Sequence, residues 1–204
     1  MLNLYYAKGT AALAPHIILE EIGKEYEATF VDFTKAEQTS PEFLKLNPKG
    51  RVPALITQNG ILTETPTILT YLSNTNPELS LAPTDPFEFA IAQSFNDYVN
   101  STIHVMHAHG KRGSRWADDT SAHESMQAKL TENMTECARM IETHYLTGPF
   151  VLGEKFSICD PYLYLVTRWL TDDGVTLDVY PNISQHRDLM NKRASVAKVI
   201  KLHD

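Results

Sequence analysis

The chain has little of three things that would point to particular classes of protein. Only 2 of its 204 residues are cysteine, too few for the disulfide framework of a small secreted protein. No apolar run approaches the roughly 18 residues that a membrane-spanning helix needs. Basic side chains are outnumbered, with 18 Lys and Arg against 25 Asp and Glu, which disfavours nucleic acid as the main partner. These absences favour an ordinary globular protein that binds neither membrane nor nucleic acid.

The same features indicate a compartment. The first residues, MLNLYYAKGT, contain no basic segment followed by a long apolar stretch, so we expect no secretory signal. A reducing cytoplasm is the expected location. Cys137 and Cys159 lie in segments with helical patterns, and we expect both to be small apolar core residues.

The first 77 residues alternate between strand and helix patterns. Short apolar and aromatic runs indicate strands, and apolar residues that recur every three or four positions indicate helices. The sequence Gln58-Asn59-Gly60 is a hairpin turn signal. The patterns predict strands at 2–7, 27–33, 52–56 and 60–64 and helices at 11–23, 40–47 and 65–74. The predicted order is therefore β-α-β-α-β-β-α.

The remainder of the chain reads as helical. Residues 77–86 carry three prolines and little periodicity, which is typical of a linker. After it, helical patterns are predicted near 86–111, 121–146, 160–172 and 183–202. The sequence thus predicts a small α/β domain over 1–77, a linker over 78–86 and an all-α domain over 87–204.

A proline directly ahead of a predicted strand marks the segment NPKGRVPALI, residues 47–56. Pro53 cannot donate to a strand ladder, so it belongs at a strand start or edge. From the segment alone, a cis Val52–Pro53 bond and an ordinary trans bond both stay open. If the bond is cis, Val52 would offer its backbone N–H and C=O to a bound peptide, as a strand does.

A second segment, LTETPTIL at 62–69, has the pattern of a helix start. Thr65 is a good N-cap residue, and Pro66 suits the first helical position. The N–H groups of such a first turn bind anions, and Glu64 beside them could pair with an ammonium group. The arrangement suits the zwitterionic end of an amino acid. Simple capping of the helix is the alternative.

Taken in order, these segments resemble the cytosolic glutathione transferases. NPKGRVPAL, the hairpin and ETPTILTYL are similar to the family's N-terminal domain, and LYYAKGTAALAPHIILEE resembles the bacterial beta class. FVLGEKFSICDPYLYLVTRW, residues 150–169, is similar to a signature of the helical domain, in which Ser157 and Asp160 form a capping box. The resemblance implies a thioredoxin-like domain that binds glutathione as co-substrate, an all-α domain that offers a small hydrophobic electrophile, and a homodimer.

The chain departs from the beta class at one position. That class carries a cysteine at the start of the first helix, where this chain aligns Ala11. The nucleophilic thiolate must then come from glutathione, whose thiol has an unperturbed pKa near 8.5. A helix N-terminus and a donated hydroxyl hydrogen bond both lower a thiol pKa. Thr10 and Tyr6 are equal candidates for that hydroxyl, and Tyr5 is assigned to the core.

Other binding roles in the first domain follow from the resemblance. Val52 would pair with the cysteinyl backbone of glutathione. Glu64 and Thr65 would hold its γ-glutamyl end. Lys49 or Lys35 would meet its glycyl carboxylate.

In the helical domain, His104 aligns with an active-site histidine of the beta class. His107 lies three residues on, on the same helix face. Asp97 lies two turns earlier on the same face, where a polar or acidic residue of related classes reaches across the dimer to the γ-glutamyl ammonium. Arg115 and Trp116 could line the electrophile pocket and favour a planar or anionic substrate.

Two alternatives accompany the histidines. Closely spaced histidines can bind zinc, but neither a cysteine pair nor an H-E-x-x-H pattern is present, so we expect no metal. A solvated polar helix end is the other alternative.

Two alternatives also accompany the proposed activity. One is a protein of the same fold that binds glutathione, or serves as an interaction module, without turnover. The other is a different glutathione-dependent enzyme, namely an isomerase, dehalogenase, peroxidase or ether-cleaving lyase.

Overall fold

A four-stranded sheet organises the N-terminal part of the chain. The computed structural model describes residues Met1–Asp204, and the strands are β1 (Leu2–Tyr6), β2 (Tyr26–Phe30), β3 (Ala54–Thr57) and β4 (Gly60–Thr63). Their order in the sheet is β2-β1-β3-β4. β1 is parallel to β2, whereas the β1–β3 and β3–β4 pairs are antiparallel. A parallel pair needs a crossover, and a tight turn joins the last two strands as the QNG signal predicts.

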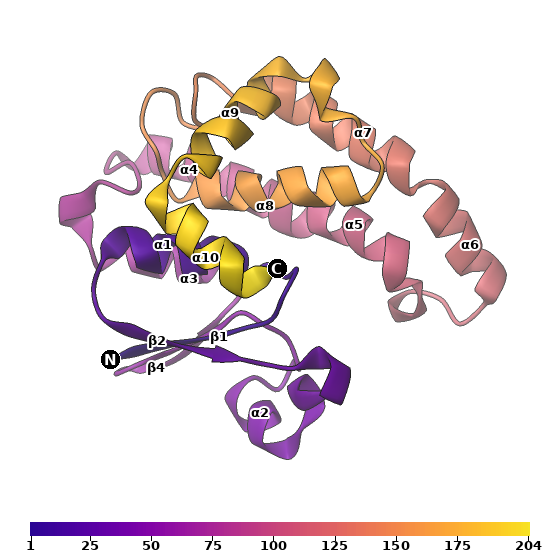
Figure 1. The fold of residues 1–204 in the computed structure, drawn as a ribbon, viewed down its shortest axis with the longest axis horizontal. Helices are drawn as coiled ribbons and strands as arrows, with labels where there is room; N and C mark the ends of the chain where they lie inside the picture. The colour runs from indigo at the N-terminus through magenta and orange to yellow at the C-terminus, as the bar shows by residue number, and fades with distance from the viewer. The chain divides into compact units, whose positions relative to one another are not determined.

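Three helices complete the predicted order. They are α1 (Leu13–Ile22), α2 (Pro41–Leu46) and α3 (Thr65–Asn74). In Figure 1, α1 and α3 lie on one face of the sheet and α2 lies on the other. The alternation of β1 agrees, because Leu4 and Tyr6 are buried while the ring of Tyr5 meets Phe43 of α2, with centroids 5.9 Å apart. The β-α-β-α-β-β-α order of a thioredoxin-like domain is confirmed.

α3 spans the predicted residues 65–74, but its cap lies one residue earlier than expected. Glu64, not Thr65, is the residue that caps the helix, and its carbonyl accepts the first helical hydrogen bond from Ile68 at 3.0 Å. Glu64 has a φ of 70°, in the left-handed region that non-glycine residues rarely adopt. Glu64 is the single residue between β4 and α3, and its left-handed backbone lets the chain turn from the strand into the helix.

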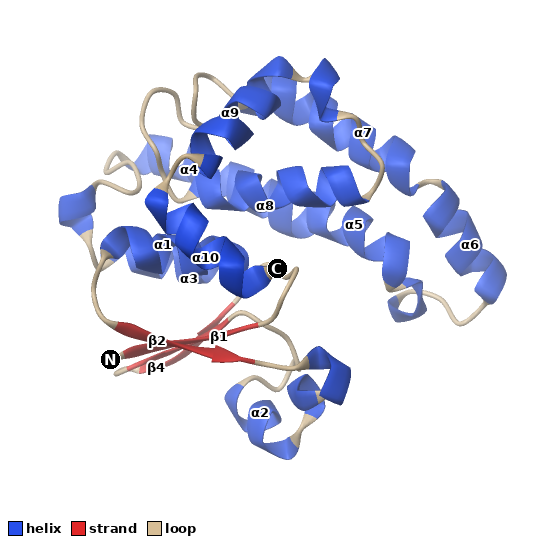
Figure 2. Cartoon of the chain, in the orientation of Figure 1, coloured by secondary structure: helices blue, strands red, loops and turns tan.

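The rest of the chain is helical, as Figure 2 shows by the absence of red strands outside the sheet. The α-helices are α4 (Pro86–Tyr98), α5 (His104–Lys111), α6 (Thr120–Ala128), α7 (Leu130–Met140), α8 (Cys159–Asp172), α9 (Pro181–Asn191) and α10 (Ala194–His203). Two π-helical turns, η4 (Val99–Ile103) and η6 (Ile141–Tyr145), follow α4 and α7. Short 3₁₀ turns are η1 (Phe33–Lys35), η2 (Glu37–Thr39), η3 (Pro77–Leu79), η5 (Gly113–Arg115) and η7 (Leu177–Val179). None of these helices is long and apolar enough to cross a membrane.

The C-terminal helix belongs to the first part of the chain. The structure divides into one unit of Met1–Ala82 with Asn191–Asp204, and a second of Pro83–Met190. The sequence predicted one helix over 183–202 in a helical domain that extends to residue 204. That prediction is wrong at its end, because the helix breaks before α10, and α10 packs on α1, as the yellow and indigo ribbons of Figure 1 show.

Charged and polar contacts attach α10 to α1. Arg193 donates to both carboxylate oxygens of Glu21, at 2.8 and 2.7 Å, and Ser195 donates to the same carboxylate. Nδ1 of His16 and Nε2 of His203 lie 2.9 Å apart in the buried centre of the contact. These pairs join residues far apart in the chain, so no local pattern could have predicted them.

The capping box predicted at Ser157 and Asp160 is confirmed in the second unit. The Asp160 carboxylate accepts from the backbone N–H of Ser157 at 2.6 Å and from that of Val151 at 2.9 Å. Nε2 of His186 lies 3.1 Å from the same carboxylate, which is fully buried. Asp160 therefore joins the start of α8, the preceding loop and α9 into one core.

Candidate functional site

Two helix N-termini converge at one edge of the first unit. The Thr65 hydroxyl, at the first residue of α3, donates to the carbonyl of Ala11, just ahead of α1, at 3.5 Å. Neither helix has a side-chain hydrogen bond at its cap. The amide N–H groups of both first turns therefore lack a side-chain acceptor at the cap. Uncapped helix N-termini side by side favour a bound anion.

Glu64 and Lys49 form an ion pair next to this edge. The ammonium of Lys49 contacts the Glu64 carboxylate and donates to the Thr63 hydroxyl at 2.7 Å. The sequence assigned Lys49 to a ligand carboxylate, whereas in the structure it is held by the residue assigned to the ligand's ammonium. The pair is about half exposed, so both groups are accessible to a solute.

The Val52–Pro53 peptide bond is cis, which resolves the alternative that the sequence left open. Val52 lies just before β3, which begins at Ala54. Val52 is outside the paired part of β3, so its backbone N–H and C=O are not used in the hydrogen-bond ladder of the sheet. Its pairing with an extended peptide stays a prediction.

Thr10 and Tyr6 have different surroundings. The Thr10 hydroxyl donates to the Ala7 carbonyl at 2.7 Å and stands three residues before α1. A hydroxyl has one hydrogen to donate, so Thr10 must turn away from Ala7 before it can donate to a thiolate. Tyr6 is only 7% exposed, with its ring 5.1 Å from that of His16 and 4.9 Å from that of His203. Because Tyr6 packs under α1 and α10, we favour Thr10 over Tyr6 as the hydroxyl that donates to a ligand thiolate.

Both cysteines of the chain are buried free thiols. Burial raises the pKa of Cys137 and, more strongly, that of Cys159, where the nearby Asp160 charge adds to the effect. A thiol with a raised pKa stays protonated at neutral pH and is a poor nucleophile. Ala11, at the start of the α1 region, is 4% exposed and offers no thiol. Any thiolate chemistry at this edge would need a thiol from a ligand.

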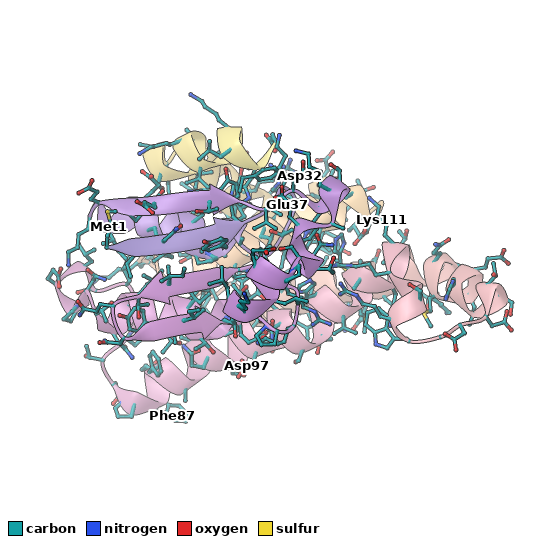
Figure 3. All side chains as sticks on the ribbon, turned by 90° about the horizontal axis from the view of Figure 1, so that it is seen from below. Met1, Asp32, Glu37, Phe87, Asp97 and Lys111 are labelled. Atoms are coloured by element: carbon teal, nitrogen blue, oxygen red, sulfur yellow. The ribbon has the colours of Figure 1, made fainter.

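Lys35 ends the 3₁₀ turn η1, which follows β2, and is paired with Asp32 at 3.2 Å. Figure 3 labels Asp32 and Glu37 on this segment, where the Glu37 carboxylate accepts from the Asp32 backbone N–H at 2.8 Å. Hydrogen bonding by the Thr34 hydroxyl is the main cause that lowers the pKa of Asp32. Lys35 is strongly exposed, and its surface pair is weak enough to exchange for another anion.

In the second unit, His104 and His107 meet one indole ring. The Trp169 ring lies 4.8 Å from that of His104 and 4.7 Å from that of His107, and the latter pair is stacked. Nδ1 of His107 lies 2.7 Å from a carboxylate oxygen of Asp173. The shared helix face predicted for the two histidines is confirmed.

The predicted relation between Asp97 and His104 is wrong. The π-helical turn η4, Val99–Ile103, separates them, and it holds more residues per turn than an α-helix does. Seven residues therefore no longer make two α-helical turns, and the two side chains leave a common face. Asp97 is exposed, and its carbonyl accepts from Ser101.

The segment after α5 carries the remaining predicted residues. Arg115 ends the 3₁₀ turn η5 and is exposed. Trp116 is 45% exposed and meets the ring of His109, with centroids 4.5 Å apart. The structure contains no group of three or more His, Cys, Asp and Glu side chains arranged to hold a metal ion.

Three residues of these clusters were missed by the sequence analysis. Asn47 orders the loop that carries Lys49, and the Asn-Pro dipeptide at 47–48 is a turn signal that could have identified it. Trp169 and Asp173 surround His107, and they lie more than 60 positions from it along the chain. No local pattern connects residues so distant.

Comparison with known proteins agrees with this architecture. The family model for the glutathione S-transferase N-terminal domain matches residues 2–74. A glutathione transferase homologue from Sulfitobacter, solved with bound glutathione, is 47% identical, with 99% of this chain and 98% of that chain covered and a TM-score of 0.96. Glutathione S-transferase GstA of Escherichia coli O157:H7 is 26% identical over 198 residues, 96% of this chain and 95% of its own.

A third relative is named for a different reaction. The maleylacetoacetate isomerase of Pseudomonas aeruginosa is 27% identical over 198 residues, 92% of this chain and 90% of its own. The fold, the matched domain and the full-length similarity to the Sulfitobacter structure agree with one another. The chain belongs to the cytosolic glutathione transferase superfamily.

Proposed function

We propose that the chain binds reduced glutathione on its first unit and adds the glutathione thiolate to a small hydrophobic electrophile. The observation that supports this most is the pair of uncapped helix N-termini beside the Glu64 carboxylate. Amide N–H groups suit a carboxylate, and Glu64 suits an ammonium. Together they match the zwitterionic γ-glutamyl end of the tripeptide. The homologue solved with bound glutathione supports the same ligand.

Each part of the tripeptide has an assigned partner in this proposal. The backbone of Val52 pairs with the cysteinyl residue, as an added strand would. Glu64 takes the γ-glutamyl ammonium, and the first turn of α3 at Thr65 takes the adjoining carboxylate. Lys35 is assigned to the glycyl carboxylate, because its side chain is exposed and its pair with Asp32 can exchange.

The thiolate forms from the ligand's own thiol, since the two protein thiols are buried. The N-terminus of α1 favours the ionised sulfur by its dipole. The Thr10 hydroxyl adds a hydrogen bond once it turns away from the Ala7 carbonyl. The thiol proton passes to solvent, and the sulfur then forms a bond to the electrophilic atom. In a substitution the leaving group departs with its bonding electron pair, and in an addition the π electrons of the attacked double bond move to the neighbouring atom, which takes a proton from solvent. Rate enhancement comes from positioning and from the lowered thiol pKa.

The second unit supplies the residues proposed for the electrophile. His104 and His107 would offer ring nitrogens, and Arg115 and Trp116 would add a charged and a planar surface. Asp97 is proposed to face a second subunit rather than the same pocket, because it is exposed and out of phase with His104.

A homodimer is part of the proposal. Phe87 and Ile91 lie one turn apart on α4 and are 72% and 44% exposed, an apolar pair that a partner subunit would cover. Figure 3 shows Phe87 projecting from the start of α4, while Asp97 lies toward its other end. The proposed location is a reducing cytoplasm, for which the two unpaired cysteines are the support.

A glutathione-dependent isomerase is the second candidate. The similarity to the maleylacetoacetate isomerase of Pseudomonas aeruginosa over nearly the whole chain favours it. An isomerase uses the same bound thiolate but releases it again after the substrate has rearranged. Consumption of glutathione therefore distinguishes the two reactions. A protein that binds glutathione without turnover would form neither a conjugate nor an isomerised product.

Calorimetric titration with reduced glutathione tests the proposal, followed by thiolate absorbance of the complex against pH. We expect binding with a thiol pKa well below 8.5. Glu64→Gln should weaken binding at least about tenfold, which corresponds to about 1.4 kcal/mol. Glu27→Gln is the matched control, because Glu27 is exposed on β2 at the opposite edge of the sheet. Equal affinity of the Glu64→Gln variant and the wild type would contradict the assigned site.

A further inference from the structure

The loop between α2 and β3 holds Lys49 in one place. The buried Asn47 side chain donates to the Arg51 carbonyl at 2.6 Å and accepts from the Lys49 backbone N–H at 3.2 Å. Gly50 has a φ of 62°, and a Cβ there would lie 3.1 Å from the Gln38 carbonyl oxygen. Only glycine fits this turn without strain. The backbone of Lys49 is therefore fixed on both sides.

From this position the Lys49 side chain reaches the residues just before the N-terminus of α3. Its ammonium group has three hydrogens, of which the Thr63 hydroxyl and the Glu64 carboxylate each accept one. The exposed fractions of the Lys49 and Glu64 side chains are 45% and 49%. The pair thus has contact with water, and its partners can be exchanged at small cost.

The Lys49 ammonium contacts the Glu64 carboxylate, which the proposed function assigns to the ligand's ammonium. Both groups are primary ammonium ions with the same hydrogen-bonding capacity. An incoming amine must therefore displace or crowd Lys49, and like charges close together are unfavourable. A ligand that brings an amine alone would leave Lys49 beside a second cation with no anion between them.

A ligand that carries an ammonium and a carboxylate on one carbon solves this problem. Its ammonium takes Glu64, and its carboxylate takes the released Lys49 and the amide N–H groups of α3. Charges of opposite sign then alternate through the site. We propose that Lys49 is a displaceable internal counterion of Glu64, and that it makes the site selective for an α-amino-acid end over a simple amine. This inference rests on the proposed function, because it deepens the role of the same site.

The test uses three ligands and the full-length protein. The first is glutathione. The second, 4-aminobutyryl-cysteinyl-glycine, keeps the amine but lacks the adjoining carboxylate. The third, glutaryl-cysteinyl-glycine, lacks the amine. Each is titrated calorimetrically into the wild type, into Lys49→Met and into Lys45→Met. Lys45 is an exposed lysine of α2, so its variant controls for the loss of one positive charge.

The wild type should prefer glutathione to the amine-only ligand. In Lys49→Met, glutathione should bind about threefold to tenfold more weakly, because its α-carboxylate loses a partner. The amine-only ligand should bind at least about threefold more tightly, because it no longer displaces Lys49. The preference for glutathione over this ligand should therefore fall at least about tenfold. Lys45→Met should leave that preference unchanged.

Two results would overturn the inference in different ways. If Lys49→Met weakens the binding of glutathione and of the amine-only ligand by the same factor, Lys49 does not make the site selective for the α-amino-acid end, while the proposed function stands. If the wild type binds none of the three ligands, the proposed function and this inference fail together. The amine-free ligand separates the cases further, because its affinity should fall in Lys49→Met only if Lys49 meets a ligand carboxylate.

Discussion

Acid should destabilise the first unit through His16. This side chain is fully buried between α1 and α10, with Nδ1 2.9 Å from Nε2 of His203. Burial lowers the pKa of His16 from 6.5 to about 4, with Glu20 opposing and Lys198 adding to the effect. Tyr6 and Tyr26 are the other titratable groups whose rings meet His16. The folded state therefore keeps a neutral imidazole that the unfolded chain protonates readily.

The sign of the effect follows from the two pKa values. Between about pH 6.5 and about pH 4, His16 is protonated in the unfolded chain but stays neutral in the folded protein. Stability from His16 is thus complete above pH 6.5 and is lost progressively as the pH falls toward 4. At 1.36 kcal/mol for each pH unit, the whole interval is worth about 3.4 kcal/mol. About 2 kcal/mol of this should disappear between about pH 7.5 and about pH 5.

Urea unfolding at these two pH values measures the loss, with His16→Asn as the variant. Asparagine cannot titrate, and its amide can still hydrogen-bond to His203. The wild type should lose about 2 kcal/mol more than His16→Asn when the pH is lowered. His144→Asn is the control, because His144 is exposed, and its pH dependence should match the wild type. Parallel pH dependence in wild type and His16→Asn would refute the reasoning.

Two further substitutions test the core and the thiol donor. Asp160→Asn should lower the free energy of unfolding, measured by urea unfolding, by about 3 kcal/mol. The buried carboxylate accepts several hydrogen bonds, and one side of the replacing amide can only donate. A loss below about 1 kcal/mol would disprove the central role of Asp160. Thr10→Val should raise the pKa of bound glutathione, measured by thiolate absorbance, whereas Tyr6→Phe should leave it unchanged because Tyr6 packs under α1 and α10. The reverse result would transfer the donor role to Tyr6.

The elements of both units follow largely from local sequence. Short apolar runs and the Asn59-Gly60 turn specify the strands, and apolar repeats specify the helices, because these signals act over a few residues. Ser157 and Asp160 cap α8 from three positions apart, so their pattern is also visible locally. The residues assigned to glutathione were found through the family resemblance, which depends on the same ordered segments.

Tertiary structure alone decided the remaining features. The helix over 183–202 splits and its last part joins α1, because Glu21 and His16 provide partners that lie more than 170 positions away. Lys49 pairs with Glu64 because two loops meet at the sheet edge, whereas the sequence indicated only a lysine in a turn. The π-helical turn η4 moves Asp97 off the face of His104, although its residues show an ordinary helical pattern. Local propensity determines which elements form, and long-range packing determines which side chains meet.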